Sequence, residues 1–532
     1  MKRMAKGILF TIILTAVMAG ASHAAIPSVE REALIAIYSS MGGDNWRKND
    51  GWKTPPLEAD GFGAIGTECF WDGVSCPSEF VNGTTIILRE VVDGINMFAN
   101  NVSGPFPIDE LLKFNELQRI DFQYNYNVSG IIPPELSKLS NLILLNLSGN
   151  KFTGTIPPSL ASLTNLVNIT LTGNQLTGPI PPELSDLPIL RHLELGNNRL
   201  TGNIPPELGK LSKLATLHLE RNYLTGSIPP ELGNLPILYN LNLFGNYLSG
   251  PIPSELGNLE SLHSLNLSDN KLSGSIPAEL GNLAKLNYLM LHKNNLSGAI
   301  PPELGNFNIL IELALWDNQL SGEIPSALGN LERISRLKLH NNQLMGSVPK
   351  ELANLTTLNG ELNLSGNKLS GELPAELSAL PTYYIHLNYN GLHTSDPALK
   401  SLLDTKSAGW DLTQTVAPAN VHISGQTASS ISLSWDSIPF TENSGAYEVY
   451  SSTAAEGPYA LAASTTDKTV ESAQVTGLLP DTTYFFRVRT VTDSHSGNRN
   501  TVVSDFAPVV TATTSGTRDI EVAPLSHDFG LV

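Results

Sequence analysis

Residues 262–283 read LHSLNLSDNKLSGSIPAELGNL, and close variants of this stretch recur about a dozen times along the chain of 532 residues. Eight of the twelve steps between recurring asparagines are 24 residues long, three are 25 and one is 23. So regular a period predicts a solenoid of stacked coils, whose function has to be sought on its surface. The recurring residues are Asn100, Asn125, Asn150, Asn174, Asn198, Asn222, Asn246, Asn270, Asn294, Asn318, Asn342, Asn367 and Asn390.

Each part of the repeat has a physical reason. Leu265 and Leu267 alternate with polar residues, which predicts a half-buried strand. Asn270 follows where the chain must turn inward, and its carboxamide can bond the backbone of its own coil and of a neighbour. Gly274 is expected to permit a tight backbone approach, and Pro277 to hold an extended segment on the outer side.

The stacked asparagines are expected to form a hydrogen-bonded ladder. Losing one of them should cost ~1–3 kcal/mol, because buried backbone groups would lose their partners. The expected ladder comprises Asn150, Asn174, Asn198, Asn222, Asn246, Asn270, Asn294, Asn318 and Asn342.

Residues 193–209, LELGNNRLTGNIPPELG, resemble the plant-type leucine-rich repeat family, with its pattern LxxLxxLxLxxNxLxGxIPxxLGxL. The match extends over residues 95–392, about 12–13 coils. The resemblance implies an α/β, β-rich solenoid with a parallel sheet on its concave face. It also implies that a protein, peptide or small ligand binds on that face, and the family has no common catalytic residues.

The N-terminal residues predict export. Residues 1–24 have three basic residues, an apolar run from Gly7 to Gly20 and small residues near the end, which is typical of a signal peptide. The alternative is a membrane anchor, for which the apolar run is short, and no later membrane span occurs in the sequence. The protein is therefore expected to be secreted, with attachment to the cell surface as an alternative.

The charge balance excludes some partners. The chain has a net charge of −18, and removing residues 1–24 would give −21. Such an acidic chain is not expected to bind nucleic acid or an anionic membrane surface as its main partner.

Residues 25–94 predict an N-terminal cap, beginning with a helix from Ser28 to Met41. Trp46, Trp52 and the segment 69–76, CFWDGVSC, resemble the W…CxWxGVxC cap that precedes plant-type repeats. An exported protein is expected to join Cys69 to Cys76 by a disulfide; two free thiols are the alternative, and a zinc site is the least expected.

Residues 393–413 are predicted to form a C-terminal cap and linker. Asp396 and Pro397 are typical of a helix start, and Trp410 could cover the last coil.

Residues 414–514 carry the alternating short runs of an all-β sandwich. Residues 430–435, SISLSW, and 478–484, LLPDTTY, resemble the fibronectin type III family. In that family Trp435 would fill the core and Tyr484 would bond backbone at a corner. Such modules in secreted proteins mostly act as spacers.

Residues 515–532 predict a linker and the start of another β-sandwich domain. The final residues resemble modules of bacterial surface proteins, which favours a bacterial exported protein and a chain that continues beyond residue 532.

A ligand is expected on the solvent-facing residues of the inner strands, where aromatic and charged side chains gather in the middle and late coils. The alternative is free variation on a solvated face. Reading part of this set as a metal site is disfavoured, because open sheets rarely support one, and we expect no metal and no cofactor. The candidate residues are His192, Glu194, His218, Glu220, Phe244, Tyr288, His292, Trp316, Arg336 and His340, with Met290 and Lys338 beside them.

Sequence motifs of catalysis are missing, so we expect a protein that is not an enzyme. The first hypothesis is a recognition protein that binds a protein or peptide, with carbohydrate as an alternative partner. The second is a structural or adhesive surface protein. The third is the non-catalytic part of a larger secreted enzyme acting on polysaccharide. The sequence does not indicate an oligomeric state.

Overall fold

The computed structural model describes residues 25–81, 85–88 and 91–516. The chain divides into two compact units, Met1–Asn294 and Asn295–Val532. The predicted signal peptide, residues 1–24, and the predicted opening of a further sandwich, residues 517–532, lie outside the described residues. Within the described ranges, every helix is too short or too polar to cross a membrane.

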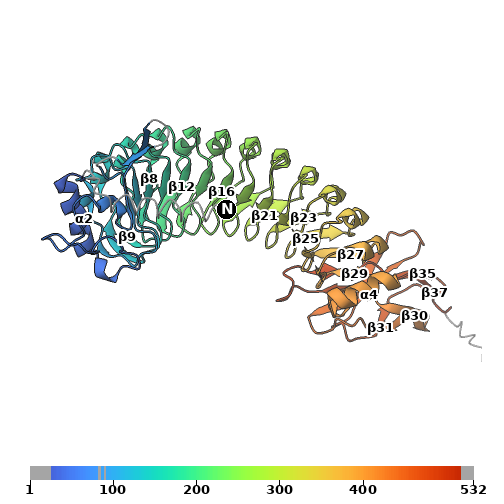
Figure 1. Cartoon of the computed structure of the whole chain (residues 1–532). Helices are drawn as coiled ribbons and strands as arrows, with labels where there is room; N and C mark the ends of the chain where they lie inside the picture. Colours follow the sequence, from blue (N-terminus) through green and yellow to red (C-terminus); the bar gives the residue numbers. More distant parts are fainter. Residues whose placement is uncertain (1–24, 82–84, 89–90, 517–532) are drawn as a thin grey trace, which may run out of the picture. The chain divides into compact units, whose positions relative to one another are not determined.

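The repeats form stacked coils, and the main strands of successive coils lie side by side (Figure 1). In the first unit these strands form one sheet in which β1 is antiparallel to β4 and the later neighbours are parallel. Its strands are β1 (Val74–Ser75), β4 (Gly94–Asn96), β6 (Arg119–Asp121), β8 (Leu144–Asn146), β10 (Asn168–Thr170), β12 (His192–Glu194), β14 (Thr216–His218), β16 (Asn240–Asn242), β18 (Ser264–Asn266) and β20 (Tyr288–Met290). In the second unit the parallel neighbours are β22 (Glu312–Ala314), β24 (Arg336–Lys338), β26 (Glu361–Asn363) and β28 (Tyr384–His386).

A second strand of two to five residues follows the asparagine in each coil, and the sequence did not predict it. These strands also pair with the neighbouring coil in parallel. In the first unit they are β5 (Ser103–Pro105), β7 (Asn127–Ile131), β9 (Lys151–Thr153), β11 (Thr177–Gly178), β13 (Arg199–Asn203), β15 (Tyr223–Thr225), β17 (Ser249–Gly250) and β19 (Lys271–Gly274). In the second unit they are β21 (Asn295–Gly298), β23 (Gln319–Gly322), β25 (Gln343–Gly346), β27 (Lys368–Glu372) and β29 (Gly391–His393).

The outer side of each coil between the first and the last is a short 3₁₀ helix, so the expected extended segment is limited to the proline. Pro277 is extended, but Ala278–Asn282 turns, because this brings Leu280 and Leu283 into the core. The helices of the first unit are η3 (Pro134–Lys138), η4 (Pro158–Ser162), η5 (Pro182–Asp186), η6 (Pro206–Lys210), η7 (Pro230–Asn234), η8 (Ser254–Asn258) and η9 (Ala278–Asn282). Those of the second unit are η10 (Pro302–Asn306), η11 (Ser326–Asn330), η12 (Lys350–Asn354) and η13 (Ala375–Ala379).

The reason for the repeat glycine differs from the expected one. A Cβ added to Gly274 would meet nothing closer than Pro251 Cβ at 3.8 Å, which is an ordinary contact. Gly274 instead has φ +79°, in the left-handed region that glycine adopts without steric cost. Backbone conformation, rather than a tight approach, therefore accounts for this residue.

Hydrogen bonds from the asparagines connect each coil to the coil before it. Asn198 Nδ2 donates to the carbonyl oxygens of Leu171 and Leu195, each at 3.0 Å, and its Oδ1 accepts the N–H of Leu176 at 3.0 Å. Asn222, Asn246 and Asn270 make the same three kinds of bond. Because each carboxamide reaches two coils, the spacing of the coils is fixed by these bonds.

The corresponding carboxamides in the other coils also contact turn backbone. They belong to Asn150, Asn174, Asn294, Asn318 and Asn342. Gln414 continues the pattern after the last coil, because its Nε2 donates to Leu387 O at 3.0 Å and its Oε1 accepts the N–H of Leu392 at 3.0 Å. A longer amide side chain thus closes the series, which the asparagine period did not indicate.

The N-terminal cap covers the apolar side of the first coil. Trp52 and Trp71 are buried with ring centroids 4.8 Å apart, and Cys69 and Cys76 form a disulfide. Its elements are α2 (Ser28–Ser40), η1 (Gly43–Asn45), η2 (Glu68–Phe70), β2 (Ser78–Val81) and β3 (Thr85–Leu88), and α3 (Ile108–Leu111) follows in the first coil. Aromatic burial protects apolar residues such as Ile95 and Met97 that the first coil would otherwise expose.

After the repeats, Asp396 caps α4 (Pro397–Lys406) by accepting the N–H of Leu399 at 2.7 Å, and η14 (Trp410–Thr413) buries Trp410. The sandwich that follows has one sheet of β30 (Ala419–Gln426), β31 (Ser430–Asp436) and β34 (Ser472–Thr476). The other contains β33 (Ala460–Ser464), β32 (Gly445–Ser452), β35 (Thr483–Thr492), β36 (Val502–Val503) and β37 (Val510–Thr513). Trp435 lies in its core, and Tyr484 Oη accepts the N–H of Leu479 at 3.0 Å. The predicted fold class is therefore confirmed in both parts.

Candidate functional site

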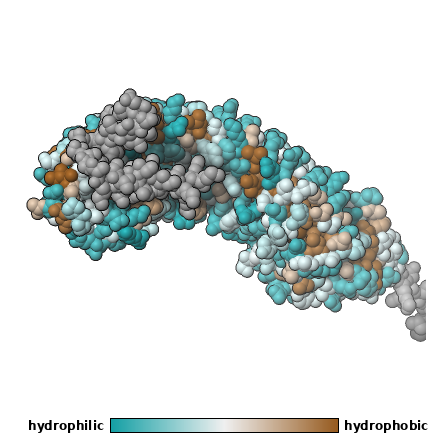
Figure 2. All heavy atoms as spheres, in the orientation of Figure 1, coloured by the Kyte–Doolittle hydropathy of each residue, from teal (hydrophilic) through white to brown (hydrophobic). Residues whose placement is uncertain are grey.

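The candidate site is the exposed sheet face, which we define as the solvent-facing side of β4 to β20 in the first unit and of β22 to β28 in the second. Alternation along a strand creates it, because Leu193 is buried while His192 and Glu194 on either side are half-exposed. Figure 2 shows that hydrophilic residues dominate the visible surface of the coils, so exposed aromatic residues are distinctive.

The structure brings four of the predicted residues together on β12, on β14 and just after β14, where Glu220 lies. Register pairs Glu194 with His218, and His192 Nδ1 lies 3.2 Å from Thr216 Oγ1. The Glu220 carboxylate lies over Gly196, where a Cβ would come within 2.2 Å of Glu220 Oε1. Among the described residues, no three metal-binding side chains are placed to share one ion.

Phe244 follows β16, and its ring lies 5.3 Å from the guanidinium carbon of Arg221. Such a cation over a ring is held electrostatically. Tyr288 in β20 is opposite Ser264 and is 38% exposed. Met290 and His292, at the end of the same coil's strand, are half-buried.

Two further aromatic residues were not predicted. The Tyr239 ring stacks on His263 with centroids 4.1 Å apart, and Tyr239 is 52% exposed. The N–H of Tyr288 donates to His263 O at 3.2 Å, so these three residues adjoin; we call them the aromatic cluster. Both missed residues directly precede strand positions, and comparing that position from coil to coil would have found them.

In the second unit, the Trp316 and His340 rings stack with centroids 5.0 Å apart. Burial lowers the pKa of the His340 imidazole. Stacking and partial burial give this pair a fixed orientation on the sheet face.

The cations of β24 are engaged in ion pairs. Arg336 Nη1 lies 3.2 Å from Glu312 Oε2, and Lys338 Nζ lies 3.1 Å from Glu312 and 3.6 Å from Glu361. The sequence indicated Arg336 and Lys338 but not their partners Glu312 and Glu361. These two glutamates are identified only by the register of the neighbouring strands. Because these charges are partly balanced, a ligand here would meet a polar rather than a strongly basic surface.

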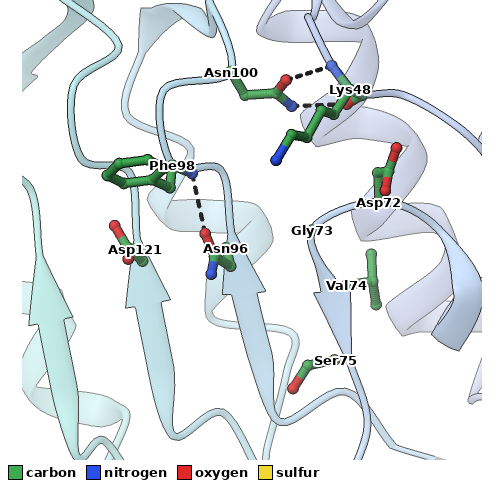
Figure 3. Close-up of a pocket in the computed structure, with 9 residues that line it drawn as sticks. All are labelled: Lys48, Asp72, Gly73, Val74, Ser75, Asn96, Phe98, Asn100 and Asp121. Atoms are coloured by element: carbon green, nitrogen blue, oxygen red, sulfur yellow. Dashed lines mark hydrogen bonds between the residues drawn. The ribbon is translucent and has the colours of Figure 1, made fainter. Parts of the chain in front are cut away.

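A hollow of about 440 Å³ lies between the N-terminal cap and the first two coils (Figure 3). Lys48 and Asp72 come from the cap, Asn96 and Phe98 from the first coil, and Asp121 from the second. Burial raises the pKa of the Asp121 carboxyl, whose Oδ1 accepts the N–H of Gln123 at 3.0 Å. The sequence did not indicate this hollow, because its walls come from segments up to 73 residues apart.

Two families match parts of the chain. The Leucine Rich Repeat family matches nine segments between residues 141 and 380, and the Fibronectin type III domain family matches residues 416–505. The repeats and the sandwich are therefore leucine-rich repeats and a fibronectin type III domain.

Several of the similar proteins are plant receptors. Receptor-like protein kinase 7 of Arabidopsis thaliana is 32% identical over 128 residues, which are 24% of this chain and 11% of that protein. The Arabidopsis receptor kinase HAESA, solved with the peptide hormone IDA and the co-receptor SERK1, is 30% identical with a TM-score of 0.60, covering 73% of this chain and 60% of the other.

The ectodomain of the receptor kinase GASSHO1/SCHENGEN3 from Arabidopsis thaliana, solved with CASPARIAN STRIP INTEGRITY FACTOR 2, is 34% identical with a TM-score of 0.58. The match covers 70% of this chain and 46% of the other. This chain thus spans about a tenth of the curated relative and about half of these solved structures.

Proposed function

We propose that the chain is a secreted or cell-surface recognition protein that binds a protein or peptide ligand on its exposed sheet face. The single observation that carries the proposal is the aromatic cluster, Tyr239, His263 and Tyr288. Exposed aromatic side chains bury large areas at low cost in conformational entropy, and they dominate binding energy at interfaces.

The arrangement of charges supports a polar, specific contact. His192 and Glu194 lie on β12, His218 lies on β14 and Glu220 follows β14, so imidazole and carboxylate groups stand in the two coils before the cluster. Similarity to plant receptors solved with peptide ligands supports a peptide over a carbohydrate ligand. Export from a bacterial cell, favoured by the C-terminal residues, belongs to this proposal.

The proposal is tested by selecting dodecapeptides from a random display library on the full chain and measuring their affinity by surface plasmon resonance. The first variant carries Tyr239→Ser and Tyr288→Ser, and a second carries Trp316→Ser and Arg336→Ser. The matched control carries Glu231→Gln and Glu255→Gln, both exposed on the outer 3₁₀ helices.

We expect at least one of the two sheet-face variants to weaken the selected peptides about tenfold or more, since losing a buried aromatic anchor costs about 1–2 kcal/mol or more. The control should bind unchanged. Equal binding by all variants, or loss only in the outer-face control, would rule out the sheet face and favour a structural or adhesive role.

A further inference from the structure

One loop of the fibronectin type III domain contacts the last coils through two carboxamides. Asn498 Nδ2 donates to Asn367 O at 2.9 Å and to Tyr389 O at 2.8 Å. Asn500 Nδ2 donates to Asn342 O at 2.5 Å and to Gly366 O at 3.3 Å. Each amide therefore bridges the backbones of two successive coils.

The four acceptors occupy equivalent positions in the repeat. Asn342 and Asn367 are ladder asparagines, while Gly366 and Tyr389 are the residues directly before a ladder asparagine in the next coil. Ladder side chains point inward, so these residues present carbonyl oxygens to the outside. Asn498 is buried, which shows that these carbonyl oxygens can hold a carboxamide out of contact with water.

The loop also fits beside an aromatic side chain. The Tyr389 ring is 5.2 Å from the His495 ring and 6.0 Å from the Phe440 ring. A Cβ added to Gly497 would come within 2.6 Å of the Tyr389 ring, so a glycine lets the loop pass the ring closely. This surface of the last coils therefore accepts a segment with two carboxamide side chains, Asn498 and Asn500, and a glycine that passes the Tyr389 ring.

The same surface is open in the first unit. A hollow of about 490 Å³ is lined by Asn222, Gly245, Asn246 and Asp269, which stand at the repeat positions of Asn342, Gly366, Asn367 and Tyr389. Within the described part of the chain, no donor reaches the carbonyl oxygens of these four residues. Their carbonyls form the same two bridging pairs, Asn222 with Gly245 and Asn246 with Asp269.

Aromatic walls border this open hollow as well. Tyr223 and Tyr247 stack with centroids 6.1 Å apart, and they are 48% and 46% exposed. On the side of the sheet face the hollow is bordered by Phe244, with Arg221 over its ring. We call this hollow the ladder trough.

We propose that the ladder trough binds an extended peptide segment that carries two carboxamide side chains two residues apart, Asn-x-Asn, next to a glycine. Each carboxamide donates to one bridging pair of carbonyls, as Asn498 and Asn500 do in the last coils, and the glycine passes the tyrosine wall. This deepens the function proposed above by adding a second contact surface, and it rests on that function only for the ligand being a peptide.

The probe is the chain's own loop as a synthetic peptide, acetyl-HSGNRN-amide, corresponding to residues 495–500. Its affinity for the full chain is measured by isothermal titration calorimetry, next to a peptide in which both asparagines are replaced by alanine. The trough variant carries Tyr223→Lys and Tyr247→Gln, side chains that other coils hold at this position as Lys271 and Gln175. The matched control carries Tyr239→Ser and Tyr288→Ser on the sheet face.

We expect binding with one site per chain, weakened about 25-fold or more for the peptide that lacks both asparagines, because each asparagine contributes at least one neutral hydrogen bond of about 1 kcal/mol net. The trough variant should weaken binding at least fivefold, and the sheet-face control should leave it unchanged.

Three results would overturn the inference: no binding of the peptide, equal affinity for the alanine peptide, or unchanged affinity of the trough variant. The third result would mean that the peptide binds the last coils by displacing the chain's own loop. Loss of binding in the sheet-face control alone would reject the trough and still leave the proposed function standing. Conversely, failure of the dodecapeptide test with success here would leave the trough and reject the sheet face.

Discussion

Replacing one ladder asparagine tests how much the ladder stabilises the coils. Asn222 is 4% exposed; its Nδ2 donates to Leu195 O at 3.0 Å and Leu219 O at 3.1 Å, and its Oδ1 accepts the N–H of Leu200 at 3.0 Å. In Asn222→Ala the two carbonyls keep a bond each from Asn198 and Asn246, whereas the Leu200 N–H loses its only acceptor.

One orphaned, buried N–H costs about 1–3 kcal/mol, and the weakened carbonyls add to it, so we expect a loss of about 2–3 kcal/mol. The matched control is Asn242→Ala, because Asn242 is half-exposed and its Oδ1 accepts only the N–H of Phe244 at 3.2 Å. We expect the control to lose less than about 0.5 kcal/mol.

Stability is measured by urea unfolding followed by circular dichroism, with hydrogen exchange of residues 195–205 read by mass spectrometry. Hydrogen exchange is needed because solenoids can open in parts rather than all at once. Equal losses in the two variants, or unchanged exchange of residues 195–205 in Asn222→Ala, would refute the reasoning.

Three shorter predictions concern other parts of the chain. Replacing Cys69 and Cys76 by alanine should cost about 2 kcal/mol and lower the calorimetric transition of the cap, and an unchanged transition would contradict the cap's dependence on the disulfide. Burial lowers the pKa of Lys468 to about 8, so between pH 8 and 10.5 the unfolded chain binds more protons at this residue than the folded chain does. The free energy of unfolding of the sandwich should therefore rise with pH over this window relative to that of Lys468→Met, as measured by thermal unfolding. Parallel pH profiles of the two proteins would contradict this prediction. Asn500→Ala should speed trypsin cleavage near residue 406 by loosening the loop from the last coils, while equal cleavage rates would show that the loop does not hold the domain in place.

The fold could be predicted in most of its parts because the physics of the repeat is local. Alternation at Leu265 and Leu267 indicated a strand, and the bonding capacity of Asn270 indicated a turn whose carboxamide reaches a neighbour. The role of Gly274 was misjudged, because sequence does not separate a need for positive φ from a need for space. The 3₁₀ helix after Pro277 was missed, because five residues are too few to show a helical period.

The site was predicted less completely, because it depends on contacts between coils. Residue types on single strands identified Trp316 and Arg336, but pairing with Glu312 required the register of adjacent strands. Tyr239 escaped notice because it lies one position outside the strand pattern. The bond from Asn498 to Tyr389 joins residues 109 apart, and nothing in the repeat period indicates it, so an expected spacer proved to be in contact with the last coils.

The central claim is that a peptide ligand lies on the exposed sheet face. Its most direct test is photo-crosslinking of a selected dodecapeptide to the full chain with p-benzoylphenylalanine replacing Tyr239, compared with the same amino acid replacing Glu255 on an outer 3₁₀ helix. We predict an ultraviolet-dependent adduct with the peptide from position 239 and none from position 255. An adduct from position 255 together with none from position 239 would contradict the claim.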